Sequence, residues 1–122
     1  MNAPRPLIAV IDDDESVRES LPDLLRELAF DVVAFASAEE FLESAQLGQT
    51  RCLILDVTMP GMTGPELNRE LRRRGTRIPT IFITADETVR PSLLEEGAID
   101  CLFKPFGEEA LVDALQTALN VR

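Results

Sequence analysis

The stretch from residue 51 to 67, RCLILDVTMPGMTGPEL, carries the pattern that decides the fold. The apolar run Cys52–Leu55 is typical of a buried strand, but the run ends on a carboxylate, Asp56. Met59-Pro60-Gly61 predicts a turn directly afterwards. Gly61 and Gly64 are expected to serve this turn alone. A strand end would hold Asp56 in a fixed geometry, and the turn would expose it to solvent.

Further apolar runs of similar length occur on both sides of this stretch, with helical patterns between them. The five expected strands are Leu7–Ile11, Val32–Phe35, Cys52–Leu55, Thr80–Ile83 and Cys101–Phe103. Strands that are apolar almost throughout and alternate with helices are typical of a parallel sheet covered on both faces. The sequence therefore predicts an α/β fold.

Helical spacing of apolar residues and capping residues place the helices. We expect a first helix that begins at the N-cap Asp14 and ends near Leu28, then helices over Ala38–Ala45, from Thr63 or Pro65 to Arg74, over Val89–Glu96 and over Glu108–Leu119. Pro22 removes a hydrogen bond inside the first helix and predicts a bend there.

Composition bounds the class of protein. The 122 residues suit one domain, residues 1–122 with a core of about 7–119, and no apolar run approaches the length of a membrane span. The N-terminus has no signal-peptide core, so a cytoplasmic location is expected. The net charge of −10 argues against nucleic-acid binding by this chain. The absence of histidine excludes a histidine phosphocarrier and any His-liganded metal.

Polar residues recur where the expected strands end. They are Asp12 and Asp13, Asp56, Thr84 and Lys104. The carboxyl ends of parallel strands form a common crevice, so these side chains should meet there. Clustered carboxylates without histidine or cysteine favour a hard ion such as Mg²⁺, and an ammonium and a hydroxyl could bind phosphoryl oxygens. The set indicates phosphoryl chemistry with a carboxylate nucleophile.

Four segments in this order, IDDDES (11–16), LILDVTMPGMTG (53–64), FITA (82–85) and FKPF (103–106), resemble the receiver domain of two-component response regulators. The resemblance covers about Leu7–Leu119. It implies a flavodoxin-like sheet in the order 2-1-3-4-5 with five helices. It is strongest to regulators that control transcription through an attached DNA-binding domain.

The resemblance also implies roles for single residues. Asp56 would accept a phosphoryl group from a phosphohistidine of a sensor histidine kinase or a phosphotransfer protein. The Mg²⁺ ligands would be Asp12, Asp13, Asp56 and the backbone carbonyl of Thr58. Thr84 and Lys104 would contact the phosphoryl group, and the Lys104–Pro105 peptide bond would be cis. Partners would include an output domain, or a second copy of the chain bound through Val89–Glu96, Cys101–Phe103 and Glu108–Leu119.

Cys101 departs from the family pattern, which has an aromatic residue at this position. In the family this residue moves together with the threonine, so the switch residues here would be Thr84 and Cys101. Phe103 should point to the same face of the sheet as Cys101 by strand alternation. Cys52 and Cys101 are expected to be reduced, packed thiols.

Two other functions fit parts of the pattern. A pseudo-receiver would bind partners without phosphorylation, which the departure at Cys101 would allow. A Mg²⁺-dependent phosphatase of the haloacid dehalogenase type also uses an aspartyl nucleophile at a strand end, but it needs a second acid where Thr58 stands. We therefore expect a signalling domain that catalyses only its own phosphorylation and dephosphorylation.

Overall fold

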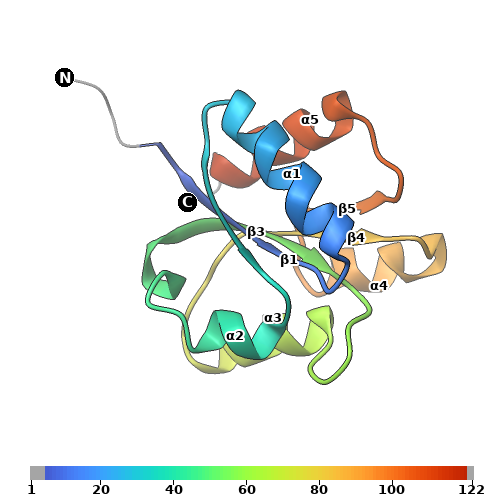
Figure 1. Cartoon of the computed structure of the whole chain (residues 1–122). Coiled ribbons are helices and arrows are strands. Elements are labelled where there is room, and N and C mark those ends of the chain that lie inside the picture. Colours follow the sequence, from blue (N-terminus) through green and yellow to red (C-terminus); the bar gives the residue numbers. More distant parts are fainter. Residues whose placement is uncertain (1–4, 121–122) are drawn as a thin grey trace.

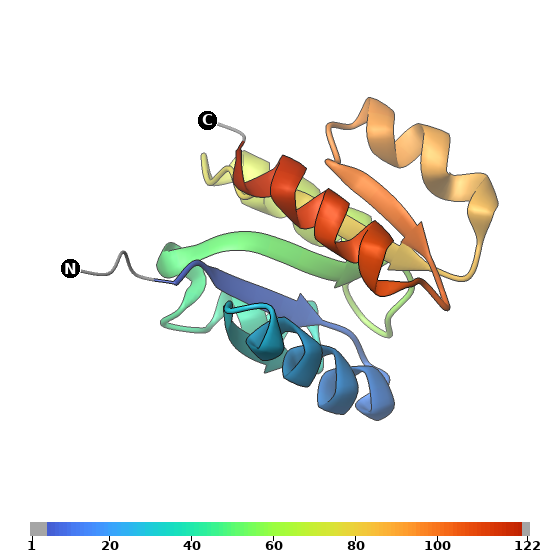
Figure 2. The same cartoon turned by 90° about the horizontal axis from the view of Figure 1, so that it is seen from above.

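The computed structural model describes residues 5–120 (Figure 1). Its strands are β1 (Leu7–Ile11), β2 (Asp31–Phe35), β3 (Thr50–Asp56), β4 (Thr80–Thr84) and β5 (Asp100–Phe103). They form one parallel sheet in the order β2-β1-β3-β4-β5, and Figure 2 shows the strand arrows pointing to the same end. The predicted fold class and strand order are confirmed.

Five helices cover the two faces of the sheet. They are α1 (Glu15–Glu27), α2 (Ala38–Leu42), α3 (Gly64–Arg73), α4 (Arg90–Glu95) and α5 (Glu108–Leu119), with 3₁₀ turns at Leu47–Gln49 and Glu87–Val89. Helices α1 and α5 lie on one face, and α2 and α3 lie on the other (Figure 1). No helix within residues 5–120 is long and apolar enough to cross a membrane.

The sheet separates two apolar layers because successive strand residues point to opposite faces. Ile8 and Val10 belong to the layer that contains residues of α1 and α5, whereas Ala9 and Ile11 belong to the layer that contains residues of α2, α3 and α4. All four of these β1 residues are fully buried. The central strands are therefore apolar on both sides, which explains why their sequences do not alternate.

Most helix ends follow local capping rules. Asp14 caps α1 as predicted, and Thr63 caps α3 in a reciprocal capping box with Glu66. Helices α1, α3 and α4 end in the same motif, in which the residue after the C-cap has a positive φ. That residue is glycine after α3 and α4 (Gly75 and Gly97), but alanine after α1 (Ala29, φ 74°).

Helix α2 is shorter than the sequence predicted, and helix α1 has a proline in its interior, as predicted. The prediction that α2 continues to Ala45 is wrong, because the helix ends at Leu42. The Ser44 hydroxyl accepts from the Gln46 N–H at 3.0 Å, and such local bonds compete with helix continuation. Helix α1 continues through Pro22 as one helix, and a bend at that residue stays a prediction.

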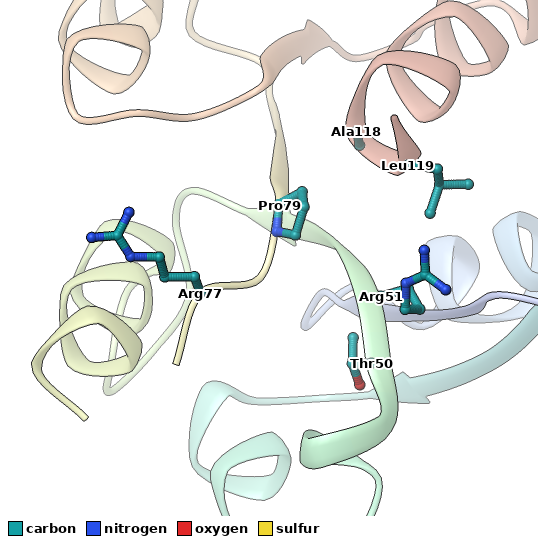
Figure 3. A pocket seen from close by; sticks show the side chains of 6 residues that line it. All are labelled: Thr50, Arg51, Arg77, Pro79, Ala118 and Leu119. Carbon is teal, nitrogen blue, oxygen red and sulfur yellow. The ribbon is translucent and has the colours of Figure 1, made fainter. Parts of the chain in front are cut away.

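A hollow of about 180 Å³ lies at the N-terminal edge of the central strands, away from Asp56. It is lined by Thr50, Arg51, Arg77, Pro79, Ala118 and Leu119. Figure 3 shows the side chains of Arg51 and Arg77 on opposite sides of Pro79, with guanidinium groups that do not converge. This hollow therefore lacks the convergent polar groups of a ligand site.

Candidate functional site

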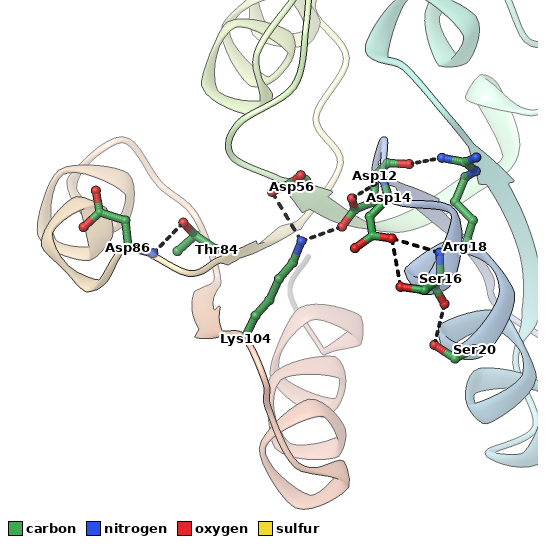
Figure 4. Close-up of polar contacts among 9 residues, drawn as sticks. All are labelled: Asp12, Asp14, Ser16, Arg18, Ser20, Asp56, Thr84, Asp86 and Lys104. Atoms are coloured by element: carbon green, nitrogen blue, oxygen red, sulfur yellow. Dashed lines mark hydrogen bonds and ion pairs between the residues drawn. The ribbon is translucent and has the colours of Figure 1, made fainter.

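The turn after β1 holds Asp12 rigidly. The Asp12 side chain is fully buried, and its Oδ1 accepts a hydrogen bond from the Asp14 N–H at 2.9 Å. The Asp12 N–H donates to the Phe35 carbonyl, which continues the pairing of β1 with β2. Arg18 of α1 donates from Nη1 to the Asp12 carbonyl at 2.9 Å (Figure 4). Backbone and side chain of Asp12 are thus both fixed.

Asp56 is the last residue of β3, and its side chain is 10% exposed. The start of α3 packs directly on it, because a Cβ atom on Gly64 would overlap the Asp56 carbonyl oxygen and lie 3.1 Å from the Phe82 ring. The φ of Gly64 is not positive, so its lack of a side chain serves close packing. The interpretation of Gly64 as a turn residue alone is therefore wrong.

Lys104 joins the two buried acids. Its Nζ lies 2.9 Å from Oδ2 of Asp12 and 3.7 Å from Oδ1 of Asp56, and Figure 4 shows it between them. Burial alone would lower the pKa of Lys104, but the hydrogen bond to Asp12 and the charge of Asp56 outweigh it and raise that pKa. The lysine is therefore held as a cation at neutral pH.

The acids form a cluster suited to a divalent cation. Asp12, Asp13 and Asp56 each offer a carboxylate oxygen, and these oxygens lie within 4.8 Å of one another. Burial, and then the charge of Asp12, raise the pKa of Asp56 to about 7. A bound cation would favour the ionised form of Asp56, and an all-oxygen donor set fits Mg²⁺. The residues present therefore fit the expected ion.

Thr84 ends β4 next to the cluster. It is 4% exposed, and its hydroxyl accepts from the Asp86 N–H at 3.0 Å, so Figure 4 shows it turned toward Asp86. Its carbonyl accepts from the Lys104 N–H at 2.8 Å, which ties the ends of β4 and β5 together. Thr58 lies exposed in the loop after β3. The Lys104–Pro105 peptide bond is cis, as expected.

A family model for the response regulator receiver domain matches residues 8–116. The chain belongs to this family. Phosphorylation-dependent switching is the general function of receiver domains, and the fold described above is theirs.

Two relatives show the similarity of this receiver domain to known proteins in sequence. It is 41% identical to "Nodulation protein W" of Bradyrhizobium diazoefficiens over 93% of this chain and 51% of the relative. It is also 41% identical to "Response regulator protein TmoT" of Ectopseudomonas mendocina, over 99% of this chain and 56% of the relative. The chain spans about half the length of the curated relatives it matches.

Solved structures of response regulators also match this chain. The response regulator StyR matches with a TM-score of 0.86 and 44% identity, over 94% of this receiver and 59% of that chain. The structure named FixJ-N matches with a TM-score of 0.85 and 32% identity, over 100% of this receiver and 98% of that chain.

Cys101, which is expected to depart from the family pattern, lies on β5 opposite Phe82 of β4. It is 2% exposed, and burial raises the pKa of its thiol. Phe103 packs in the same layer, which confirms the expected alternation. Both cysteines of this receiver are free and buried, as predicted.

Sequence reasoning missed two polar contacts near the site. Arg18 bonds the Asp12 carbonyl, and Glu39 of α2 bonds the loop after β3. Both side chains contact backbone groups, which carry no signature in the sequence of the contacted segment. The helical position of Arg18, six residues after Asp12, was the one local signal that could have pointed to its contact.

Proposed function

We propose that this receiver domain accepts a phosphoryl group on Asp56 from a phosphohistidine of a sensor histidine kinase or a phosphotransfer protein. The observation that carries the proposal is the convergence of Asp12, Asp56 and Lys104, from three different strand ends, on one point. Within this set Asp56 is the acid that ends the central strand β3, and the Lys104 cation lies between it and the Asp12 carboxylate. It also ends a strand that is buried on both faces, so its position is fixed.

The transfer is a displacement at phosphorus. A carboxylate oxygen of Asp56 forms a bond to phosphorus, the bond from phosphorus to the imidazole nitrogen breaks, and its electron pair returns to the ring. Lys104, already 3.7 Å from Asp56, would neutralise a phosphoryl oxygen there. The proposed Mg²⁺ ligands are Asp12, Asp13, Asp56 and the Thr58 carbonyl. When bound, Mg²⁺ supplies positive charge that stabilises the phosphoryl oxygens.

Switching would begin at Thr84. Its hydroxyl now accepts from the Asp86 N–H, so a rotation toward a phosphoryl oxygen gives up this bond and loosens the start of the loop that leads to α4. Cys101, two strand positions before Phe103 on the same face, would respond in the layer shared with α4. A thiol fills less volume than an aromatic ring, so its response would involve repacking around Phe82.

The proposed output is control of transcription. One relative, 38% identical over 92% of this chain and 50% of its own length, is named "Transcriptional regulatory protein TdiR" of Thauera aromatica. An output domain, or a second copy of this chain, would bind the surface formed by α4, β5 and α5. These partners and the kinase would meet the receiver in the cytoplasm.

The test uses a small phosphodonor. The protein is incubated with Mg²⁺ and acetyl phosphate or phosphoramidate, and its intact mass is measured. We expect one added phosphoryl group, which is absent after Asp56→Asn and absent in EDTA. Glu43→Ala, a change of an exposed acid outside the cluster, should label as the wild type does.

Two outcomes would replace the proposal. A wild-type protein that binds Mg²⁺ but forms no adduct would be a pseudo-receiver. Continuous release of phosphate from phosphate esters, without a stable adduct, would indicate a phosphatase. Thr58, which stands two residues after Asp56, argues against the phosphatase, because that position would need an acid.

A further inference from the structure

A side chain of α2 contacts the loop that follows the proposed acceptor. Oε2 of Glu39, in the first turn of α2, accepts a hydrogen bond from the Met62 N–H at 3.0 Å, and 23 residues separate the two. Met62 belongs to the β3–α3 loop, residues 57–63, which also carries Thr58. Helix α2 supplies none of the strand-end residues of the site, so this bond connects it to the site from outside.

Gly61 makes room for this carboxylate. Its φ is +75°, and a Cβ atom on it would lie 2.8 Å from Oε2 of Glu39. Another residue there would strain the backbone, and its Cβ atom would require the carboxylate at the end of the Glu39 side chain to shift. The loop sequence and the position of Glu39 are therefore matched to each other.

The same loop is tied at its base as well. The Gly64 N–H donates to the Val57 carbonyl at 3.1 Å, and Thr63 caps α3. With the Glu39 bond added, both the base and the far side of the loop are fixed. The backbone of Thr58 lies between these two attachments.

We infer that Glu39 is a positioning residue, which holds the β3–α3 loop in the conformation that presents the Thr58 carbonyl to a divalent cation. This inference rests on the proposed function, because it takes Thr58 as a ligand. Outer residues that orient metal ligands set the affinity of the site, although they do not touch the ion.

Two simpler roles for Glu39 predict different behaviour. An acid in the first turn stabilises α2 through the helix dipole, without any effect on the loop. A negative charge near the acidic cluster could also attract the cation through space. The variant Glu39→Gln separates these roles from positioning, because the amide oxygen can still accept the Met62 bond while the charge is gone.

The first measurement needs no metal. Amide hydrogen exchange of Met62 is followed by NMR in the metal-free protein. We expect about tenfold faster exchange in Glu39→Ala, since the amide loses its acceptor, and near wild-type exchange in Glu39→Gln. Glu43→Ala, at the other end of α2, is the matched control and should leave Met62 unchanged. Unchanged exchange in Glu39→Ala would overturn the inference.

The second measurement is the Mg²⁺ dissociation constant by titration calorimetry. Glu39→Ala should raise it about tenfold, the low end of the range for residues that orient ligands, and Glu39→Gln less than about twofold. Equal weakening in both variants would show action through charge and overturn the inference. If the wild type binds Mg²⁺ and Glu39→Ala binds it equally well, the inference about Glu39 is overturned while the proposed function stands. A wild type that binds no Mg²⁺ would overturn both.

Discussion

Lys104 Nζ donates to Oδ2 of Asp12 at 2.9 Å across 92 residues of sequence. This ion pair connects the segments that follow β1 and β5 at the acidic edge of the sheet. The Asp12 side chain is fully buried, whereas the Lys104 side chain is 28% exposed. The lysine therefore acts as an internal counter-ion for an acid that solvent cannot reach.

Lys104→Ala should destabilise the metal-free protein by about 1–3 kcal/mol. A buried pair that loses one partner costs roughly 3–5 kcal/mol, and the partial exposure of Lys104 reduces this. The measurement is urea unfolding in EDTA and in excess Mg²⁺, and the loss should shrink with Mg²⁺ because the ion neutralises Asp12. Arg26→Ala removes an exposed pair with Asp23 and should cost less than about 0.5 kcal/mol. Equal losses for Lys104→Ala in both buffers would contradict the role as counter-ion.

Gly64→Ala should cost about 2–3 kcal/mol or prevent folding, because the new methyl group overlaps the Asp56 carbonyl oxygen. Gly48→Ala is the matched control, since a Cβ atom there meets nothing within 4 Å. It should change the free energy of unfolding by less than about 0.5 kcal/mol. Urea unfolding of both variants checks the prediction, and similar stabilities would show that α3 can move away from β3 at little cost.

Ala29→Gly should stabilise the protein by about 0.5–1 kcal/mol. Ala29 is exposed and has a φ of 74°, a conformation that glycine adopts without the steric cost of a Cβ atom. The reverse change, Gly75→Ala, is made at the equivalent position after α3, where a Cβ atom meets nothing within 4 Å. Gly75→Ala should destabilise the protein by a similar amount, because the added methyl group causes backbone strain and no steric clash with other residues. Thermal unfolding should show that the melting temperatures of the two variants shift in opposite directions. Shifts of the same sign would show that the cost of a Cβ atom at positive φ does not determine stability at these positions.

Stability should fall at alkaline pH because of Cys52. Burial raises the pKa of its thiol from 9.0 to about 12. Between these values the unfolded chain gives up the proton that the folded chain keeps, so the free energy of unfolding decreases as pH rises. From about pH 8 to about pH 10 the wild type should lose about 1 kcal/mol more than Cys52→Ala, measured by urea unfolding. Parallel pH profiles would mean that Cys52 ionises equally in both states.

The sequence predicted those features that local patterns determine. All five strands and the two longest helices were found within about two residues, since apolar runs and caps lie next to the elements they define. Helix α2 was predicted too long because Ser44 offers an alternative partner to the Gln46 backbone. The strand-end residues of the site were predictable because parallel strands end at one edge. The contacts of Gly64 and Glu39 were not, because each involves a backbone group that only the folded chain brings near.

The division of the interior by the sheet has a consequence for engineering. Phe82, Cys101 and Leu93 of α4 share one layer, whereas α1 and α5 rest on the other. Substitutions that create a cavity in the layer of Phe82 should alter how α4 packs on the sheet. They should leave the packing of α1 and α5 on the other face unchanged. The two apolar layers can therefore be redesigned almost independently of each other, because the five-stranded sheet separates them.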